Sequence, residues 1–460
     1  MYGLFNALEL GKRALIAQQF AMSNTGHNIA NVNTPGYSRQ RVTLEATRPL
    51  YTTQGNVGTG VVVSNIVQIR DLFLTEQYRK EQSNLSRWET TNHALAQIET
   101  FINEPSDGGM NQLLTDFWNS WEDLSVHPDA SATIIESAQV LVNAFHEYSE
   151  QLASLRESVD DDISESIRQI NGLARQVADL NRQVMSQELG GRTANDLRDR
   201  RNYLIDQIAQ YTDVRTVEQK GGSVSVYLGS MSLVEGQDYL SVATEERGSI
   251  EGSYTVAYWE DTTFEIDFSG GQLLALTDLR DKLIPQAQDE LDAIAQALVE
   301  QVNAVHRQGV GSDGSTGVNF FDPYLTDAIN IRLNPEVAGN PAKLAVSLSG
   351  EPGDVRNAQA LSDLRSAKVL GGGSLTINEA YGAMTSTIGI RVGESQTLKE
   401  NYELLVMQVE NSRQAIQGVS IDEEMANMIK YQRAYEAAAR IITYTDEALD
   451  TVINGMGVTR

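Results

Sequence analysis

Apolar side chains recur at intervals of three and four residues through most of this chain, which is the spacing that places them on one face of an α-helix. The longest such run goes from Ile135 to Val184 and is apolar at twelve of its fifteen steps. A helix of this length would extend for roughly 75 Å. Further helical patterns cover residues 4–22, 70–104 and 284–306, and the chain returns to helix from about residue 357. The pattern therefore predicts a helical rod.

The period changes to two between Val214 and Phe268, where apolar and polar residues alternate and glycine turns intervene. This segment predicts a small β unit. Residues 40–68 also read as extended, and residues 307–355 are rich in glycine, proline, aspartate and asparagine. We predict that residues 307–355 are loops and short strands attached to the β unit, at the far end of the rod.

The predicted fold class is mainly α with an inserted β domain (α+β). A long helical rod is built from both halves of the chain, and the terminal helices pair as an inner coiled-coil-like domain. A break in the helical phase at Gly418 marks a joint between rod and inner domain. The predicted domains are residues 1–50 with 418–460 (inner), 51–213 with 272–306 and 356–417 (rod), and 214–271 with 307–355 (β).

Both ends of the chain carry amphipathic helical patterns, although chain ends usually fray. Short helices are marginally stable alone, so other molecules must cover part of their apolar surface. We predict that residues 1–40 and 420–460 order as paired helices only when neighbouring copies bury their remaining faces. The candidate assembly residues are Leu4, Leu8, Leu15, Met22, Asn28, Asn31, Asn33, Pro35, Gly36, Tyr37, Ile421, Met425, Met428, Tyr435, Ile442, Leu449 and Ile453.

Composition narrows the classes of function. The formal net charge is −27, and a surface this acidic disfavours nucleic acid as a partner. Residues 1–100 hold nine lysines and arginines against seven acidic residues, so copies of this part can approach one another without strong repulsion. There is no cysteine, and no apolar run approaches the roughly 20 residues of a membrane span. The first thirteen residues do not have the charge and apolar pattern of a secretory signal peptide.

No motif indicates catalysis, so we predict no catalytic, cofactor-binding or metal-binding residues. Residues 309–314 (GVGSDG) match a dinucleotide-binding pattern in letters, but they follow a predicted helix instead of a strand. The five histidines lack ligand spacing, and Asp160 to Asp162 point in different directions on a helix. A hydrolase would require a nucleophile–base pair or a metal cluster. An acidic surface adhesin stays open as a function of the β unit.

Four segments carry a resemblance to a known family. Residues 26–40 (GHNIANVNTPGYSRQ) resemble a signature that bacterial flagellar rod, hook and hook-associated proteins share. Residues 422–435 (DEEMANMIKYQRAY) and 309–321 resemble the hook-associated protein 1 family, and residues 195–201 (NDLRDRR) fit it. The resemblance covers essentially the whole chain. Some members of that family carry a further β domain after the segment that matches Phe320-Phe321, and this chain lacks it.

The resemblance implies a structural layer between the flagellar hook and the filament, which serves as the platform for filament assembly. It implies export through the flagellar type III apparatus without cleavage, and hence an extracellular place on the flagellum after a cytoplasmic stage. The implied partners are other copies of the chain, the hook protein, hook-associated protein 3, and a cytoplasmic chaperone at the C-terminal region. The alternative within the same class is a hook or distal-rod axial protein.

Overall fold

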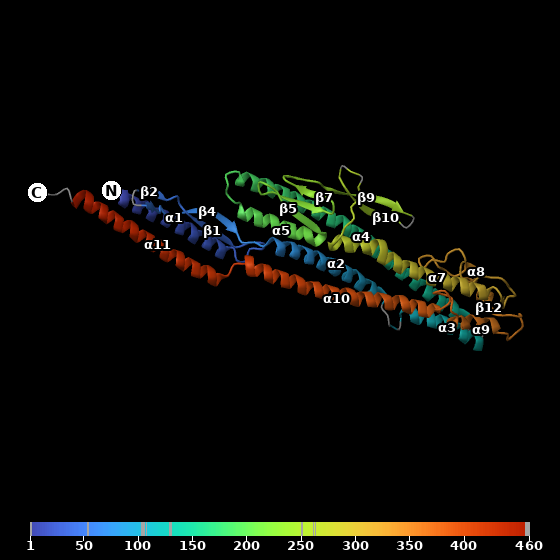
Figure 1. Cartoon of the computed structure of the whole chain (residues 1–460). Helices are drawn as coiled ribbons and strands as arrows, with labels where there is room; N and C mark the ends of the chain where they lie inside the picture. The colour runs from blue at the N-terminus through green and yellow to red at the C-terminus, as the bar shows by residue number, and fades with distance from the viewer. Residues whose placement is uncertain are drawn as a thin grey trace.

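The computed structural model is elongated, with helices from both halves of the chain lying side by side (Figure 1). The structure describes residues 2–52, 55–102, 106, 108–127, 131–249, 252–260, 262 and 264–455. The prediction of a mainly helical chain with small β elements is confirmed.

The rod is organised around α4, a single helix of 58 residues. All the predicted seam positions between Ile135 and Val184 are buried except Ile135, Arg156 and Leu173. They pack against neighbouring helices of the same chain, so the seam is intramolecular core. The helices of the rod are α2 (Leu72–Ile102), α3 (Met110–Val126), α4 (Ser131–Glu188), α5 (Asn195–Tyr211), α6 (Gly271–Asp278), α7 (Ile284–His306), α9 (Arg356–Asp363) and α10 (Ile377–Gln417). A π-helical turn, η2 (Leu279–Leu283), joins α6 to α7.

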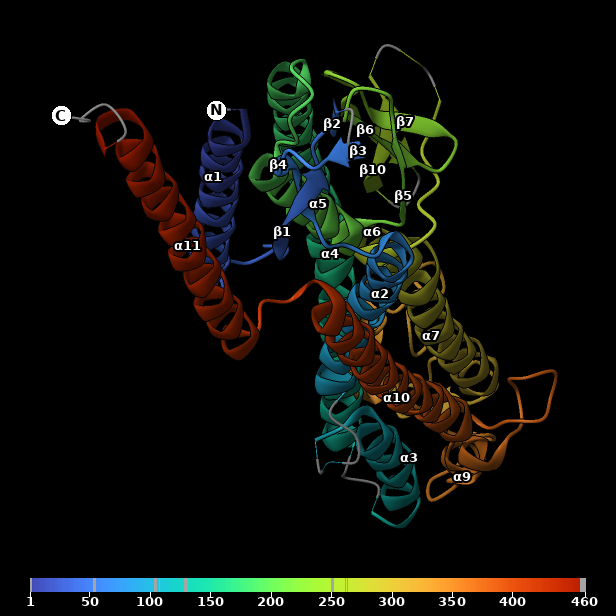
Figure 2. The ribbon, with the colours of Figure 1, turned by 60° about the vertical axis from the view of Figure 1, so that its left-hand side comes forward.

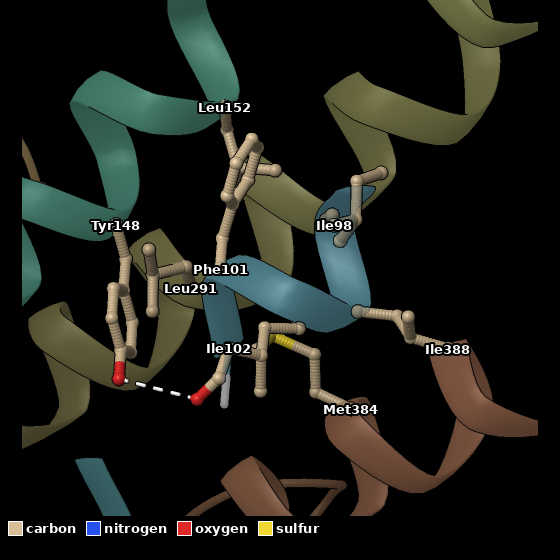
Figure 3. Close-up of a pocket in the computed structure, with 9 residues that line it drawn as sticks. Ile98, Phe101, Ile102, Tyr148, Leu152, Leu291, Met384 and Ile388 are labelled. Atoms are coloured by element: carbon tan, nitrogen blue, oxygen red, sulfur yellow. Dashed lines mark hydrogen bonds between the residues drawn. The ribbon is translucent and has the colours of Figure 1, made fainter. Parts of the chain in front are cut away.

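Four of these helices meet around an apolar cavity in the middle of the rod (Figure 3). Phe101 of α2, Leu152 of α4, Leu291 of α7 and Met384 of α10 are among the side chains that line it. The cavity has a volume of about 10 Å³, which is at the lower limit for one water molecule. The core here is therefore closely packed and offers no room for a ligand.

The predicted β unit packs along α4. Its main sheet is antiparallel with the strand order β5-β6-β7-β8, and a separate hairpin pairs β9 with β10. The strands are β5 (Val214–Glu218), β6 (Val224–Leu228), β7 (Met231–Glu235), β8 (Asp238–Tyr239), β9 (Val242–Ser249) and β10 (Gly252–Trp259). Asp160, the first of the three successive aspartates, accepts hydrogen bonds from the Thr255 backbone N–H and from Arg280, and so ties β10 to α4.

Residues 307–355 do not join this sheet, contrary to our expectation; they lie at the opposite end of α7, beside α3 and α9 (Figure 1). The 23 residues of α7 carry the chain roughly 35 Å along the rod before this segment begins. The β unit therefore lies along the rod, and residues 307–355 form the far end of the rod. The short elements there are β11 (Val310–Gly311), α8 (Pro335–Ala338), η3 (Pro341–Lys343) and β12 (Ala345–Ser347).

Two polar side chains at the end of α7 hold this segment. Asn303 donates to Phe321 O at 3.0 Å and accepts from Phe321 N at 2.9 Å. His306 accepts from Ala345 N at 3.0 Å through Nε2, so its Nδ1 carries the hydrogen that it donates to Val318 O at 2.8 Å. Burial lowers the pKa of His306 to about 4, which keeps the ring neutral in this arrangement.

At the near end, α1 (Tyr2–Ala30) and α11 (Ile421–Asp450) lie side by side in both views (Figures 1 and 2). The strands β1 (Gln40–Ala46) and β4 (Val61–Gln68) form an antiparallel pair against α1, and β2 (Leu50–Thr52) pairs with β3 (Gly55–Val57) between them. The predicted extended character of residues 40–68 is confirmed. The predicted break in the helical pattern at Gly418 is also confirmed, because α10 ends at Gln417 and α11 begins at Ile421.

Candidate assembly site at the two chain ends

The contact between α1 and α11 is antiparallel and close. A Cβ atom on Gly11 would lie 2.7 Å from Cγ1 of Ile442 near one end, and one on Gly26 would lie 3.9 Å from Cε of Met428 near the other. Ala438 and Thr445 are buried in α11 on the same side. Small residues therefore let the two helix backbones approach, which the hydrophobic pattern alone does not reveal.

The predicted seam of α11 divides into two groups. Met428, Tyr435, Ile442 and Leu449 are half-buried and alternate with the buried positions 424, 438 and 445, so they border the contact with α1. Ile421, Met425 and Ile453 are exposed. The predicted positions therefore lie beside the most deeply buried positions of α11 and not on them. The buried residues are charged, small or polar (Glu424, Ala438 and Thr445), so a pattern of large apolar residues does not select them.

The predicted residues of α1 lie in a similar way. Leu4, Leu8, Leu15 and Met22 are each half-buried. The fully buried positions are Gly11, Ala17, Ala21, Asn24, Thr25 and Asn28. The helix runs on from the predicted end at residue 22 to Ala30 because its last turns are anchored by buried polar groups instead of apolar ones.

The joint is the contact between the end of α1, the loop that follows it, the start of β1 and the start of α11. Asn28 lies at its centre. Its Nδ2 donates to Gln40 O at 2.9 Å and to Glu424 Oε2 at 3.1 Å. Its Oδ1 accepts from Tyr37 Oη at 2.7 Å and from Gln40 N at 3.0 Å. All the hydrogen-bonding capacity that an amide side chain usually satisfies is used, in a residue that is 1% exposed. Asn28 therefore fastens α1 at once to β1, to its own loop and to α11.

An ion pair closes the same joint from the other side. Arg39 reaches Glu424 Oε1 at 2.7 Å and Glu423 Oε2 at 2.8 Å. The Glu424 side chain is only 3% exposed, so its charge relies on Arg39 and Asn28. The Arg39 backbone N–H also donates to Gln417 O at 2.8 Å, which ties the last residue of α10 to the loop after α1.

The joint is attached to the rod through the first turns of α5. Gln40 Nε2 donates to Asp196 at 2.7 Å, and Ser38 N donates to Asp199 Oδ2 at 3.0 Å. Burial raises the pKa of Asp199 to about 6, although the Ser38 N–H opposes the shift. Burial also raises the pKa of Tyr37 above its usual range, and Asp196 and other nearby carboxylates act in the same direction.

Asp199 predicts a pH dependence of stability. Its folded-state pKa lies above the ordinary value of 3.8, so the folded chain binds the proton more tightly and loses this contribution as pH rises through about 6. The asparagine of an Asp199→Asn variant has no charge to bury. We expect this variant to gain stability relative to the natural chain as pH rises from 4 to 7, by on the order of 1 kcal/mol.

Urea denaturation midpoints of the two proteins at each pH measure this gain. Asp179→Asn on the exposed face of α4 is the control and should track the natural chain. A stability difference between Asp199→Asn and the natural chain that does not change with pH would contradict the assignment.

The rest of the motif forms an exposed loop beside a groove of about 390 Å³. Asn33, Pro35 and Gly36 are exposed, and Asn31 is half-buried, donating to His27 O at 3.0 Å. Gly36 has φ of 75° and its Cβ would lie 2.8 Å from Tyr203 Cβ, so only glycine fits there. The structure thus brings Asn28, Asn31 and Tyr37 together, places Gly36 against Tyr203, and leaves Asn33 and Pro35 exposed.

Sequence reasoning did not select the residues that complete the joint: Asn24, Arg39, Gln40, Asp196, Asp199, Glu423 and Glu424. Arg39 and Gln40 lie in residues 26–40, the two glutamates in residues 422–435, and Asp196 and Asp199 in residues 195–201. For these six residues, their presence in segments of family resemblance was the available signal, whereas Asn24 lies outside the segments. Hydrophobic periodicity could not find them, because they act through hydrogen bonds and charge.

Among the residues that the structure describes, no group of three or more histidine, aspartate or glutamate side chains is placed to hold a metal ion. Within the same ranges, no helix combines the length and apolar character that a membrane crossing requires.

Residues 8–37 match the family of flagella basal body rod proteins, and residues 413–455 match the C-terminal family of flagellar basal body rod FlgEFG proteins. These two segments are the paired ends described above. Residues 95–321 match the helical domain of flagellar hook-associated protein FlgK.

Whole-chain relatives extend the match. The flagellar hook-associated protein 1 of Bacillus subtilis is 32% identical, over 100% of this chain and 99% of the relative. That of Escherichia coli is 26% identical, over 96% and 98%. Both alignments are longer than this chain, so these relatives contain residues without a counterpart here. The flagellar hook junction protein FlgK of Burkholderia pseudomallei has the same fold, with a TM-score of 0.67 at 16% identity over 74% of this chain and all of that one.

The chain is a rod of helices whose two ends pair, and both ends match families of flagellar basal body rod proteins. Together these features define a structural protein of the bacterial flagellum. The chain belongs to the flagellar hook-associated protein 1 family, a family of structural proteins of the hook–filament junction.

Proposed function

We propose that copies of this chain form the layer between hook and filament and that the paired ends α1 and α11 are the interface by which they stack. The observation that carries the proposal is the apolar outer surface of this pair. Several large apolar side chains of the two helices are exposed, and groups of such side chains mark contacts with other molecules. The exposed side chains are Phe5, Ile16 and Phe20 on α1, and Ile421, Met425, Ile429, Ile441 and Tyr444 on α11.

The predicted assembly residues take different parts in this proposal. The exposed residues Ile421, Met425 and Ile453 would contact neighbouring copies directly. The half-buried leucines of α1, with Met428, Tyr435, Ile442 and Leu449 of α11, would hold the pair in the shape that the neighbours recognise. The loop tip formed by Asn33, Pro35 and Gly36 would touch the adjacent copy beside the groove.

The charge distribution supports stacking through this end. Residues 1–100 carry a small positive net charge, whereas the whole chain carries −27. Like-charge repulsion between copies is therefore concentrated on the rod and the β unit, away from α1. In a tube of stacked copies, the inner ends would pack together and the acidic rods would face outward.

The proposed partners follow from a place between two assemblies. We propose the hook protein on one side and hook-associated protein 3 on the other, with the chain serving as the platform on which the filament grows. Export through the type III apparatus would precede assembly. The apolar face of α11 would have to be covered in the cytoplasm, which is the proposed task of an export chaperone at the C-terminal region.

A deletion strain tests the proposed function. Cells that lack this chain are expected to keep intact hooks, to lose filaments, and to shed flagellin into the medium, and expression of the natural chain should restore swimming. Electron microscopy of the cells and immunoblotting of the medium measure these outcomes. Normal filaments combined with lost surface attachment would favour an adhesin and overturn the proposal.

A further inference from the structure

A pocket of about 340 Å³ lies where the end of β4, the start of α2, the first half of α5 and strands β5 and β6 meet. No part of the proposed assembly role uses it. Four of the residues that line it are arginines, in a chain with a net charge of −27. These are Arg70, Arg79, Arg198 and Arg201.

Two of the four are neutralised by carboxylates. Arg79 reaches Asp206 at 2.6 Å. Arg198 reaches Glu188 at 2.7 Å and Glu218 at 2.8 Å. The acidic groups Glu188, Glu218 and Asp206 around the pocket are thus already engaged, and the remaining carboxylate in the lining, Glu76, is exposed.

The other two arginines form no ion pair with a carboxylate in the described part of the chain. Arg70 donates through Nε to Thr75 Oγ1 at 3.2 Å. Arg201 donates through Nη1 to Asn181 Oδ1 at 2.9 Å and to Gly222 O at 2.6 Å. Its Nε is buried and meets no acceptor among the described residues.

A bound anion would stabilise the positive charges of Arg70 and Arg201. Arg201 is 1% exposed, and a buried guanidinium without an anion is unfavourable. Burial is the main cause that lowers the pKa of Arg70 and of Arg201 to about 10. For Arg201, the charges of Arg198 and Arg70 act in the same direction on the pKa, whereas Glu218 and Glu188 oppose the shift. The two cations Arg70 and Arg201 therefore face one pocket and repel each other.

We propose that this pocket binds a small tetrahedral oxyanion, such as phosphate or sulfate, between the guanidinium groups of Arg70 and Arg201. The planar fork of a guanidinium suits two oxygens of such an anion. Thr193 and Asn195 at the start of α5 also line the pocket, although the Ala194 backbone N–H there already donates to Glu188 Oε1 at 2.9 Å. The pocket lies at the lower end of the size range of ligand sites, which favours a small ion.

The bound anion would join the start of α2 to α5 next to the joint. Gln68 in the pocket wall already donates to Asn195 O at 2.7 Å, and Asn195 also donates to Gln40 Oε1 at 3.3 Å. Because the anion would bind only the folded chain, it should raise stability in proportion to the logarithm of its concentration above the dissociation constant.

Thermal unfolding of the full chain under a phosphate titration, with ionic strength held constant by sodium chloride, tests the proposal. We expect a saturable rise in unfolding temperature for the natural chain, and at least a tenfold weaker apparent affinity for Arg70→Gln. Arg70→Lys, which keeps the charge and loses the fork, should be intermediate. Arg182→Gln is the matched control, because Arg182 is 60% exposed on α4 and pairs with Asp179.

Phosphorus-31 NMR of the natural chain provides a measurement that needs no variant. Saturable broadening of the phosphate line is expected, with competition by sulfate and none by chloride. Absence of saturable broadening, or an equal phosphate response in Arg70→Gln and the natural chain, would overturn the oxyanion site. Neither result would bear on the assembly role, which the deletion strain tests separately.

Discussion

Asn28→Asp is expected to open the joint between the terminal pair and the rod. The substitution keeps the shape of the side chain but replaces an N–H donor by a carboxylate oxygen, 3.1 Å from Glu424 Oε2. Two buried carboxylates would then face each other, and the Gln40 carbonyl would keep only the hydrogen bond from Asn24 Nδ2. Unpaired buried charge of this kind destabilises by roughly 3 to 5 kcal/mol.

We expect Asn28→Asp to destabilise α1 and α11 before it destabilises the rod. Asn28 connects α1, β1 and α11, whereas the rod has its own continuous core. We therefore expect hydrogen exchange to accelerate in α1 and α11 and to stay unchanged in α4. Asn28→Ala should have the same direction with a smaller effect, because it leaves Glu424 paired with Arg39.

Asn33→Asp is the control within the same motif, since Asn33 is exposed. It should leave exchange in α1 and α11 as it is in the natural chain. If Asn28→Asp also showed natural exchange rates and restored swimming to a deletion strain, Asn28 would not have the anchoring role that its contacts indicate.

Gly11→Val is expected to block assembly while the rod stays folded. A Cβ at this position would already lie 2.7 Å from Ile442 Cγ1, 3.5 Å from Ala438 O and 3.6 Å from Ile441 Cγ2. Valine adds two further methyl groups, which the antiparallel pair can accommodate only by separating. Overpacking of this kind costs about 1 to 3 kcal/mol. It would also displace the apolar outer surface on which stacking depends.

Gly3→Val provides a matched comparison on the same helix. A Cβ on Gly3 would meet nothing within 4 Å, and both variants gain the same helix propensity relative to glycine. The difference between them therefore reports on the contact with α11. Swimming, and recovery of the chain in isolated flagella, measure incorporation, and circular dichroism confirms that the rod is folded.

Full incorporation of Gly11→Val would mean that the pair seen here is not the assembled form. The same experiment bears on the prediction that residues 1–40 and 420–460 order only on assembly. If the ends are already paired in the isolated chain, Gly11→Val should lower its helix content, whereas Gly3→Val should not.

Sequence periodicity was sufficient for elements whose burial depends on apolar side chains. The long helix α4, the β unit between Val214 and Phe268 and the break at Gly418 all appear in the pattern because each changes the spacing of hydrophobic residues. The family also came from sequence, since residues 26–40 and 422–435 form a specific combination. These features are local, and local spacing encodes them.

The tertiary structure alone decided which face of each terminal helix is buried and what closes the joint. Ala438, Thr445 and Gly11 occupy the close contact because they are small, and Glu424 is buried because Arg39 and Asn28 reach it from 385 and 396 residues away in sequence. Hydrophobic periodicity carries no information about polar contacts between residues so far apart in the sequence. The position of residues 307–355 was missed for a similar reason, because it depends on the length of α7 and on Asn303 and His306 at its end.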